Sequence, residues 1–167
     1  MTLLFNPSRK TALMGVISGV IAMATGLTAS AAVTQSITLQ GMVAEQVFIE
    51  IEGVAPYRNL NLTETATDLH VANVHEISNS ATGYTVTLKS INGGSLKNKN
   101  DLIPYRARYG LNFVTLSHDP QVIAREDGTL DIIDVRRQLK ISYTGRPRGQ
   151  LTRGIYQDTL QFQISAN

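Results

Sequence analysis

The side chains that could support catalysis or metal binding are few and scattered in this chain of 167 residues. There are three histidines and no cysteine, which excludes thiol catalysis and cysteine metal sites. His70 and His75 are expected on one strand, five residues apart, and an odd spacing points side chains to opposite faces of a strand. His118 precedes an Asp-Pro turn, where we expect it to be solvated. We therefore predict no histidine metal site.

Carboxylates and hydroxyls give no stronger signal for an enzyme. Glu50 and Glu52 could pair on one face of a strand, but they alternate with isoleucines and are more simply its solvent-facing side. The serines lack the G-x-S-x-G context of a nucleophile elbow, and the glycines are spread through turns rather than gathered before a helix. Short basic pairs at 136–137 and at 146/148 are expected to be exposed loop or edge charges. We predict no catalytic residue, no cofactor and no metal.

The N-terminal residues have the three parts of a secretory signal peptide. Arg9 and Lys10 begin it, an apolar run follows over 11–27, and Ala29-Ser30-Ala31 supplies a small-x-small cleavage pattern. The alternative is a membrane anchor, which needs about 20 consecutive apolar residues, whereas this run is shorter and interrupted by Gly and Ser. We predict cleavage after Ala31 and a secreted mature chain.

The charge of the mature chain argues against a nucleic-acid partner. Without Arg9 and Lys10, basic and acidic residues are equal in number. The distribution is uneven, because residues 32–88 contain six acids and only Arg58 as a base. A head-to-tail polymer could use this polarity, although it could equally reflect which strands face water. Without disulfides, the domain must be stabilised by a core or by a partner.

Residues 32–167 consist of short alternating runs separated by turn residues. Apolar residues recur at alternate positions, with some polar interruptions, in 43–51, 69–77, 84–88, 139–143 and 156–164. Asn92-Gly93-Gly94 is a strong turn signal, and 125–131 is expected to form a polar loop with Asp127-Gly128 at its tip. The pattern predicts about seven to nine strands in an all-β sandwich forming one domain.

Both ends of the mature chain are strand-like. From Tyr156 to Ile164, every second residue belongs to the set Tyr156, Asp158, Leu160, Phe162 and Ile164, and the residues between them are polar. Three more residues follow Ile164. At the other end, residues 32–41 (AVTQSITLQG) alternate in the same way. This first segment is either the ordinary first strand of a complete sandwich or a donor strand that completes the sheet of a neighbouring molecule.

Two motifs resemble those of chaperone–usher pilins and the related spore-coat-U-type secreted domains. GIYQDTLQFQIS resembles the closing strand of these pilins, and VHEISNSATGYTVTLKSINGG resembles their mid-domain signature. The resemblance covers most of 33–167, and the sharp motifs about a third of it. The chain differs from many members in having no disulfide, and from some in ending Ser165-Ala166-Asn167 without a penultimate aromatic.

The resemblance implies an immunoglobulin-like β-sandwich (42–167) that lacks its last strand, preceded by a donor-strand extension (32–41). A periplasmic chaperone would fill the groove until, at an outer-membrane usher, the extension of another subunit replaced it in a growing fimbria. The implied partners are sister subunits, the chaperone, the usher and a host or surface receptor. The donor residues would be Val33, Gln35, Ile37, Leu39 and Gly41, and the acceptor groove would include Leu160, Phe162 and Ile164.

Two other functions stay open from the residues themselves. The chain could be a self-contained secreted sandwich that binds a glycan or a protein through its loops. A secreted hydrolase is retained only formally, because no group of residues supports it. The state of residues 32–41 distinguishes the first alternative from a fimbrial subunit, since a self-contained sandwich would pair this segment within its own sheet.

Overall fold

The computed structural model describes residues 33–167, so the expected signal peptide (1–31) and Ala32 lie outside the described residues. Two units make up the chain, one ending at Gln40 and one spanning Gly41–Asn167. Nine strands and one short 3-10 helix occur in the described part, all within the second unit. No helix among residues 33–167 is long and apolar enough to cross a membrane.

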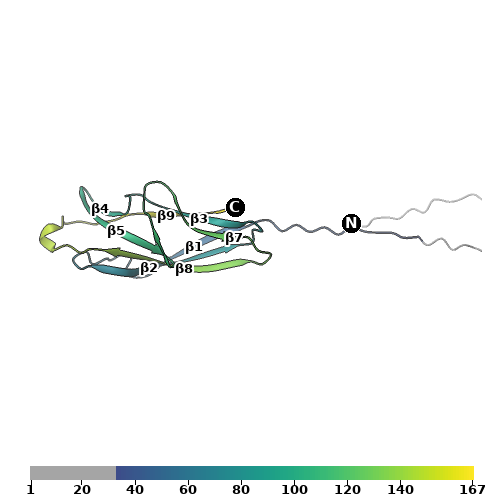
Figure 1. Ribbon diagram of the computed structural model, residues 1–167, viewed down its shortest axis with the longest axis horizontal. Coiled ribbons are helices and arrows are strands. Elements are labelled where there is room, and N and C mark those ends of the chain that lie inside the picture. The colour runs from purple at the N-terminus through teal and green to yellow at the C-terminus, as the bar shows by residue number, and fades with distance from the viewer. Residues whose placement is uncertain (1–32) are drawn as a thin grey trace, which may run out of the picture. The chain divides into compact units, whose positions relative to one another are not determined.

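The strands form two antiparallel sheets (Figure 1). Their order is β1-β2-β8-β5-β4 in the larger sheet, where β6 also pairs with β5, and β7-β3-β9 in the smaller. The predicted all-β, sandwich-like fold is thereby confirmed. The bounds are β1 Val47–Gly53, β2 Ala66–Ser78, β3 Gly83–Ser90, β4 Ser95–Asn98, β5 Asp101–Tyr109, β6 Asn112–Val114, β7 Gln121–Asp127, β8 Ile133–Tyr143, η1 Arg148–Gln150 and β9 Leu160–Ala166.

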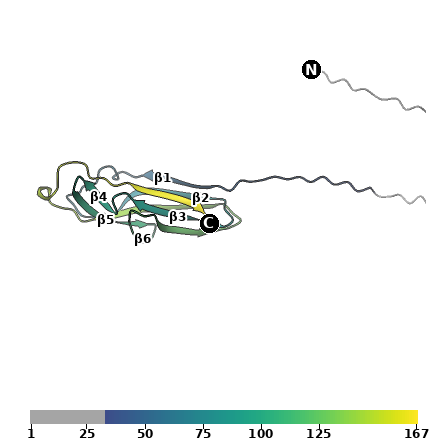
Figure 2. The same ribbon diagram turned by 90° about the horizontal axis from the view of Figure 1, so that it is seen from above.

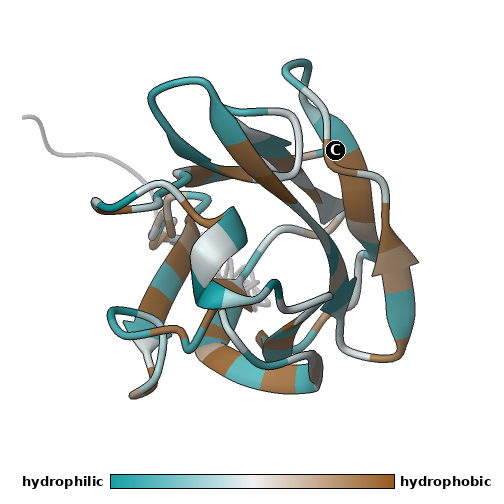
Figure 3. Ribbon diagram, turned by 90° about the vertical axis from the view of Figure 1, so that its left-hand side faces the viewer, coloured by the Kyte–Doolittle hydropathy of each residue, from teal (hydrophilic) through white to brown (hydrophobic). Residues whose placement is uncertain are grey.

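The core lies between the two sheets, because each strand turns alternate residues inward. Apolar and polar segments therefore alternate along the strands in Figure 3. Val74, Val86 and Leu88 are completely buried. The principal cluster of buried residues is Val71, Ala72, Val74, Leu96, Ile103, Tyr105, Ala107, Tyr109, Leu139, Ile141 and Tyr143.

An irregularity in β2 changes which of its residues face inward. The pairing of β2 with β8 shifts between His70 and Ala72, and both Val71 and Ala72 are buried. After this shift the even-numbered residues face the core. Glu76 is therefore completely buried, and Ile77 pairs with Asp134 on the outer face.

The same shift corrects the prediction that His70 and His75 point to opposite faces. His70 pairs with Lys140 and His75 with Arg136, and these two partners are four residues apart on β8. An even spacing places both partners on the outer face, so both histidines lie there too. About 13 Å of strand separates them at roughly 3.3 Å per residue, so they still cannot share a metal ion.

Two further strand boundaries differ from the sequence prediction. Strand β7 continues through Asp127, so Arg125, Glu126 and Asp127 pair with β3 and are not part of a loop. Strand β9 begins only at Leu160, so Tyr156 and Asp158 precede the closing strand. The predicted turn at 92–94 is present, with Gly93 and Gly94 both in the left-handed region at φ 60° and 79°.

Candidate functional site

Strands β1 and β9 each have one unpaired edge. Within the described residues, β1 pairs only with β2, over Val47–Gly53, and β9 pairs only with β3, over Leu160–Ala166. In Figure 2, β9 (yellow) runs between β3 and β1, but it has no ladder of hydrogen bonds to β1. The facing edges of the two sheets therefore present backbone N–H and C=O groups to a further strand.

An apolar groove opens between these two edges. It contains a cavity of about 330 Å³ whose walls come from both sheets. Ile51 faces inward on β1, yet 47% of its surface is exposed because nothing covers it on this side. The residues around the cavity are Ile51, Gly53, Tyr57, Leu60, Val71, Ala72, Leu96, Tyr105, Leu139, Ile141, Asp158, Leu160 and Phe162.

The structure brings two of the three predicted acceptor residues to this cavity. Leu160 and Phe162 line it, and the ring of Phe162 packs against Tyr109 with 5.9 Å between centroids. Ile164 is on the same face of β9 and is partly buried opposite Val86, but it does not line the cavity. The cavity thus occupies the end of the groove where β9 begins and β1 ends.

The five predicted donor residues are all exposed and belong to no strand. Val33, Ile37 and Leu39 have 82%, 84% and 87% of their surface exposed. Gln35 and Gly41 are also exposed, and Gly41 is the first residue of the second unit. Apolar side chains of this size are more often buried than exposed, so Val33, Ile37 and Leu39 are unusually exposed for their type.

The turn after β2 holds the short segment that precedes β1. The side chain of Asn79 accepts a hydrogen bond from the backbone N–H of Gln46 (2.6 Å) and donates one to the carbonyl of Ala44 (2.9 Å). Ser80 Oγ donates to the carboxylate of Glu45 at 2.5 Å. These contacts fix residues 44–46 before β1.

Asp158 ties the segment before β9 to the domain. Its carboxylate accepts hydrogen bonds from Ser90 Oγ (2.5 Å), Tyr105 Oη (2.7 Å) and the backbone N–H of Asn92 (2.9 Å). Burial, together with the bond to Asp158, raises the pKa of Tyr105, so the phenol stays protonated and donates. Asp158 therefore fixes the 90–94 turn and one wall of the groove, a role that the simple alternation of the sequence did not indicate.

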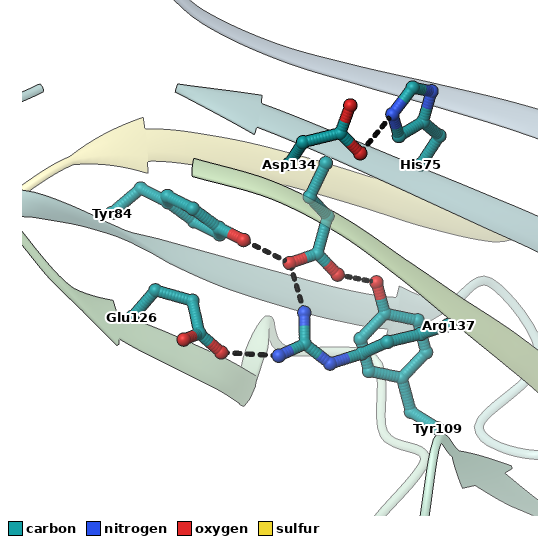
Figure 4. Close-up of polar contacts among 7 residues, drawn as sticks. His75, Tyr84, Tyr109, Glu126, Asp134 and Arg137 are labelled. Carbon is teal, nitrogen blue, oxygen red and sulfur yellow. Dashed lines mark hydrogen bonds and ion pairs between the residues drawn. The ribbon is translucent and has the colours of Figure 1, made fainter. Parts of the chain in front are cut away.

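A second buried polar cluster lies at the other end of the interior (Figure 4). Glu76 accepts hydrogen bonds from Tyr84 Oη (2.6 Å), from Tyr109 Oη and from Arg137. Arg137 also pairs with Glu126 on β7. Burial raises the pKa of both tyrosines, and the neighbouring carboxylate adds to this effect. The sequence pattern did not indicate this cluster, because the register shift in β2 is what turns Glu76 inward.

This cluster links β2, β3, β5, β7 and β8 but provides no group for chemistry. Each oxygen of Glu76 already accepts from a tyrosine, and Arg137 is shared between two carboxylates. Full satisfaction of buried polar groups is typical of a structural network. His75 is separate on the outer face, with Nε2 2.8 Å from Asp134 Oδ1. Among the described residues no three His, Asp or Glu side chains converge as a metal site.

The site with the clearest geometry is therefore the apolar groove between β1 and β9. Compared with known proteins, the chain matches no family model and no curated protein. The groove and its two unpaired edges are the features from which a function can be argued.

Proposed function

We propose that this protein is a structural subunit of a surface fimbria, secreted through the periplasm and assembled by donor-strand exchange with a chaperone and an usher. The observation that carries the proposal is the apolar groove between two unpaired strand edges, in a chain whose own residues 33–41 form an exposed, alternating, unpaired segment. The activity is assembly and surface attachment through a receptor.

The strand order supports an immunoglobulin-like sandwich that lacks one strand. An immunoglobulin constant-type domain has strands A-B-E-D in one sheet and C-F-G in the other. The order β1-β2-β8-β5 corresponds to the first sheet, and β3-β9 to the neighbouring strands C and F. The place of strand G, beside β9, is vacant in this correspondence, and that place is where the groove opens.

The energetics favour a strand as the occupant. A donor strand would hydrogen-bond to the free edge of β9 and cover Ile51, Leu160 and Phe162. Burying three side chains the size of Val33, Ile37 and Leu39 contributes about 1.5–3 kcal/mol each, which offsets part of the entropy cost of ordering the segment. A ladder of backbone hydrogen bonds adds to this balance. Such binding tolerates sequence variation, as a polymer of similar subunits requires.

A self-complemented chain tests the proposal. A copy of residues 32–41 is appended after Asn167 through a short Asn/Gly turn, so that it returns antiparallel to β9. Because the chain now fills its own groove, we expect a product that no longer polymerises through donor strands, with a higher midpoint of thermal unfolding and no need for a chaperone. A matched control carries Lys in the appended copy at the positions equivalent to Ile37 and Leu39, and we expect it to behave as the unmodified chain.

The opposite variant removes residues 32–41 and is coexpressed with its chaperone. The expected product is a soluble chaperone complex that accepts a donor strand from another subunit but cannot donate one. A truncated chain that is a stable monomer without chaperone, with no stabilisation from the appended copy, would refute the proposal. That outcome would favour a self-contained binding module.

A further inference from the structure

The outer face of the larger sheet carries opposite charges on opposite sides. Glu50 and Glu52 lie on β1 at one edge of this sheet. Arg106 and Arg108 lie on β5 toward the other edge, and Lys140 on β8 pairs with Arg108. The uneven charge along the sequence thus becomes a polarity across one face of the fold.

The register shows that these side chains share the outer face. Glu50 pairs with His75, which in turn pairs with Arg136. Asp134, Arg136, Gln138 and Lys140 alternate along β8 with residues that turn inward, among them the core residues Leu139 and Ile141. A polar hollow of about 640 Å³ lies in the middle of this face, and the residues around it include Glu50, Glu52, His75, Arg136 and Gln138.

Most charges on this face are not neutralised by neighbours. Asp68 pairs with Arg108 at 2.7 Å and Asp134 with His75 at 2.8 Å, which leaves Arg106, Arg136 and Lys140 as the unpaired bases of this face. Among the described residues, none of these three bases forms an ion pair, and neither Glu50 nor Glu52 does. Strand β2 lies between Glu50 and Arg136, so two strand spacings, roughly 9–10 Å, hold the opposite charges apart.

We propose that this outer face binds the same face of a second copy of the chain about a two-fold axis. The rotation brings the acidic edge of each copy over the basic side of the other, so that every ionic contact is made twice. Phe48, on the acidic side, is 54% exposed, and Phe113, on the basic side, is 73% exposed. They supply apolar contact area at the two ends of the interface.

Because this face carries both acidic and basic side chains, the partner that fits it best is a second copy of the chain. A polyanion would be repelled by Glu50 and Glu52, and an acidic or basic protein would meet like charge on one half. A partner must carry the inverse pattern, and a rotated copy of this face carries it. The contact uses neither the groove nor residues 33–41, so it would join subunits side by side, independently of donor-strand exchange.

A charge swap on the full chain tests the interface. One variant carries Glu50→Lys and Glu52→Lys, and the other carries Arg106→Glu and Lys140→Glu. Sedimentation equilibrium is measured at about 0.05 M and about 1 M NaCl, where the Debye length falls to about 3 Å. We expect the unaltered chain to dimerise at low salt, with Kd rising at least about tenfold at high salt. Each variant alone should be monomeric, and an equimolar mixture should form heterodimers at low salt.

A matched control changes charge on the other sheet. Gln161→Lys with Gln163→Lys adds two positive charges on the outward face of β9, and the salt-sensitive dimer should persist with unchanged Kd. The proposal is overturned if the unaltered chain is monomeric at low salt, or if the mixed variants do not associate. The proposal is also overturned if the chain still associates at high salt and in both charge variants, because association would then depend on the groove rather than on these charges.

Discussion

The two ends of the interior differ in what they bury: one holds a hydrogen-bonded polar cluster, and the other an apolar cavity that is only partly covered. Where β9 ends, the buried carboxylate of Glu76 is fully satisfied by Tyr84, Tyr109 and Arg137. Where β9 begins, a cavity of about 330 Å³ is walled mostly by apolar side chains, and Leu160 and Phe162 are only partly covered. One end is complete within the chain, and the other has apolar surface without an internal partner.

This difference follows from the cost of each kind of exposure. An unpaired buried charge is costly enough that it must be neutralised within the fold itself. Partly exposed apolar surface costs less and can remain until a partner covers it, at about 25 cal/mol for each Å² removed from water. We therefore expect substitutions at the polar end to affect the folding of the chain, and substitutions at the apolar end to affect its assembly.

The largest expected effect comes from breaking the Glu76 cluster. Replacing Arg137 with Met leaves a carboxylate with no exposed surface and no cation, which destabilises by about 3–5 kcal/mol. Urea denaturation followed by circular dichroism measures the loss. The control is Arg125→Met, an exposed residue on β7 of the smaller sheet, where we expect a change below about 0.5 kcal/mol.

A double variant separates lost charge pairing from lost packing. If Arg137→Met is too unstable to study, adding Glu76→Leu removes the uncompensated charge and should recover part of the stability, as replacement of buried ion pairs by apolar residues often does. An Arg137→Met chain as stable as the unaltered one would show that the cluster does not stabilise this end of the interior.

The next effect is expected at Asp158, which borders the apolar end but is itself fully hydrogen-bonded. Asp158→Ala leaves Tyr105 Oη and the backbone N–H of Asn92 without their acceptor, at a cost of about 2–3 kcal/mol. The same denaturation measurement applies. Asp119→Ala is the control, since no hydrogen bond to its carboxylate occurs among the described residues. Equal effects of the two substitutions would contradict the proposed role of Asp158.

Leu160 should distinguish assembly from folding. Its side chain faces a cavity that already exists, so Leu160→Ala should lower the free energy of unfolding of the free chain by only about 1 kcal/mol. Capture of a peptide with the sequence of residues 32–41 should weaken about tenfold, which corresponds to about 1.4 kcal/mol of lost contact. Fluorescence anisotropy of a labelled peptide measures this affinity.

The matched control for Leu160 is its neighbour on β9. Gln161 points to the outer face, so Gln161→Ala should change neither stability nor peptide affinity appreciably. If Leu160→Ala leaves the peptide affinity unchanged, the cavity is not part of the acceptor groove. If it unfolds the chain, the apolar end is as self-sufficient as the polar end and the contrast between them fails.

The sequence predicted the fold class because strand alternation is a local property. The runs around Val86 and Ile141 have a period of two, and such strands pair in sheets wherever one face can be buried. The same alternation put Leu160 and Phe162 on one apolar face of β9, and both line the cavity, although a groove at this place was implied only by the resemblance to pilins. It also anticipated an alternating N-terminal segment, which is exposed and without a strand partner.

The rest depended on tertiary detail that periodicity does not contain. The irregularity near Val71 reverses the inward parity of β2, and no turn residue in the sequence marks it. Glu76 was therefore missed as a buried acid, and the histidines were assigned to the wrong faces. Asp158 fits the alternation of the closing strand, yet its role comes from Ser90 and Tyr105, which are distant in sequence. Such contacts are settled by packing rather than by local preference.

The smallest effect is expected at Asp101, a polar clamp near solvent on the connection that leads to β9. Its carboxylate accepts hydrogen bonds from Tyr156 Oη, from the backbone N–H of Thr152 and from Arg146, and these hold its pKa well below the usual range. A lowered pKa stabilises the folded state above the unfolded pKa of about 3.9, and this contribution is lost as pH falls through the folded pKa.

The stability difference between the unaltered chain and Asp101→Asn should thus be constant from about pH 5 to 7 and shrink below about pH 4. Urea denaturation at several pH values measures it, with Asp131→Asn as an exposed control. A difference that stays the same at pH 3 would mean that the clamp acts through shape rather than charge, and that the connection to the apolar end is not held electrostatically.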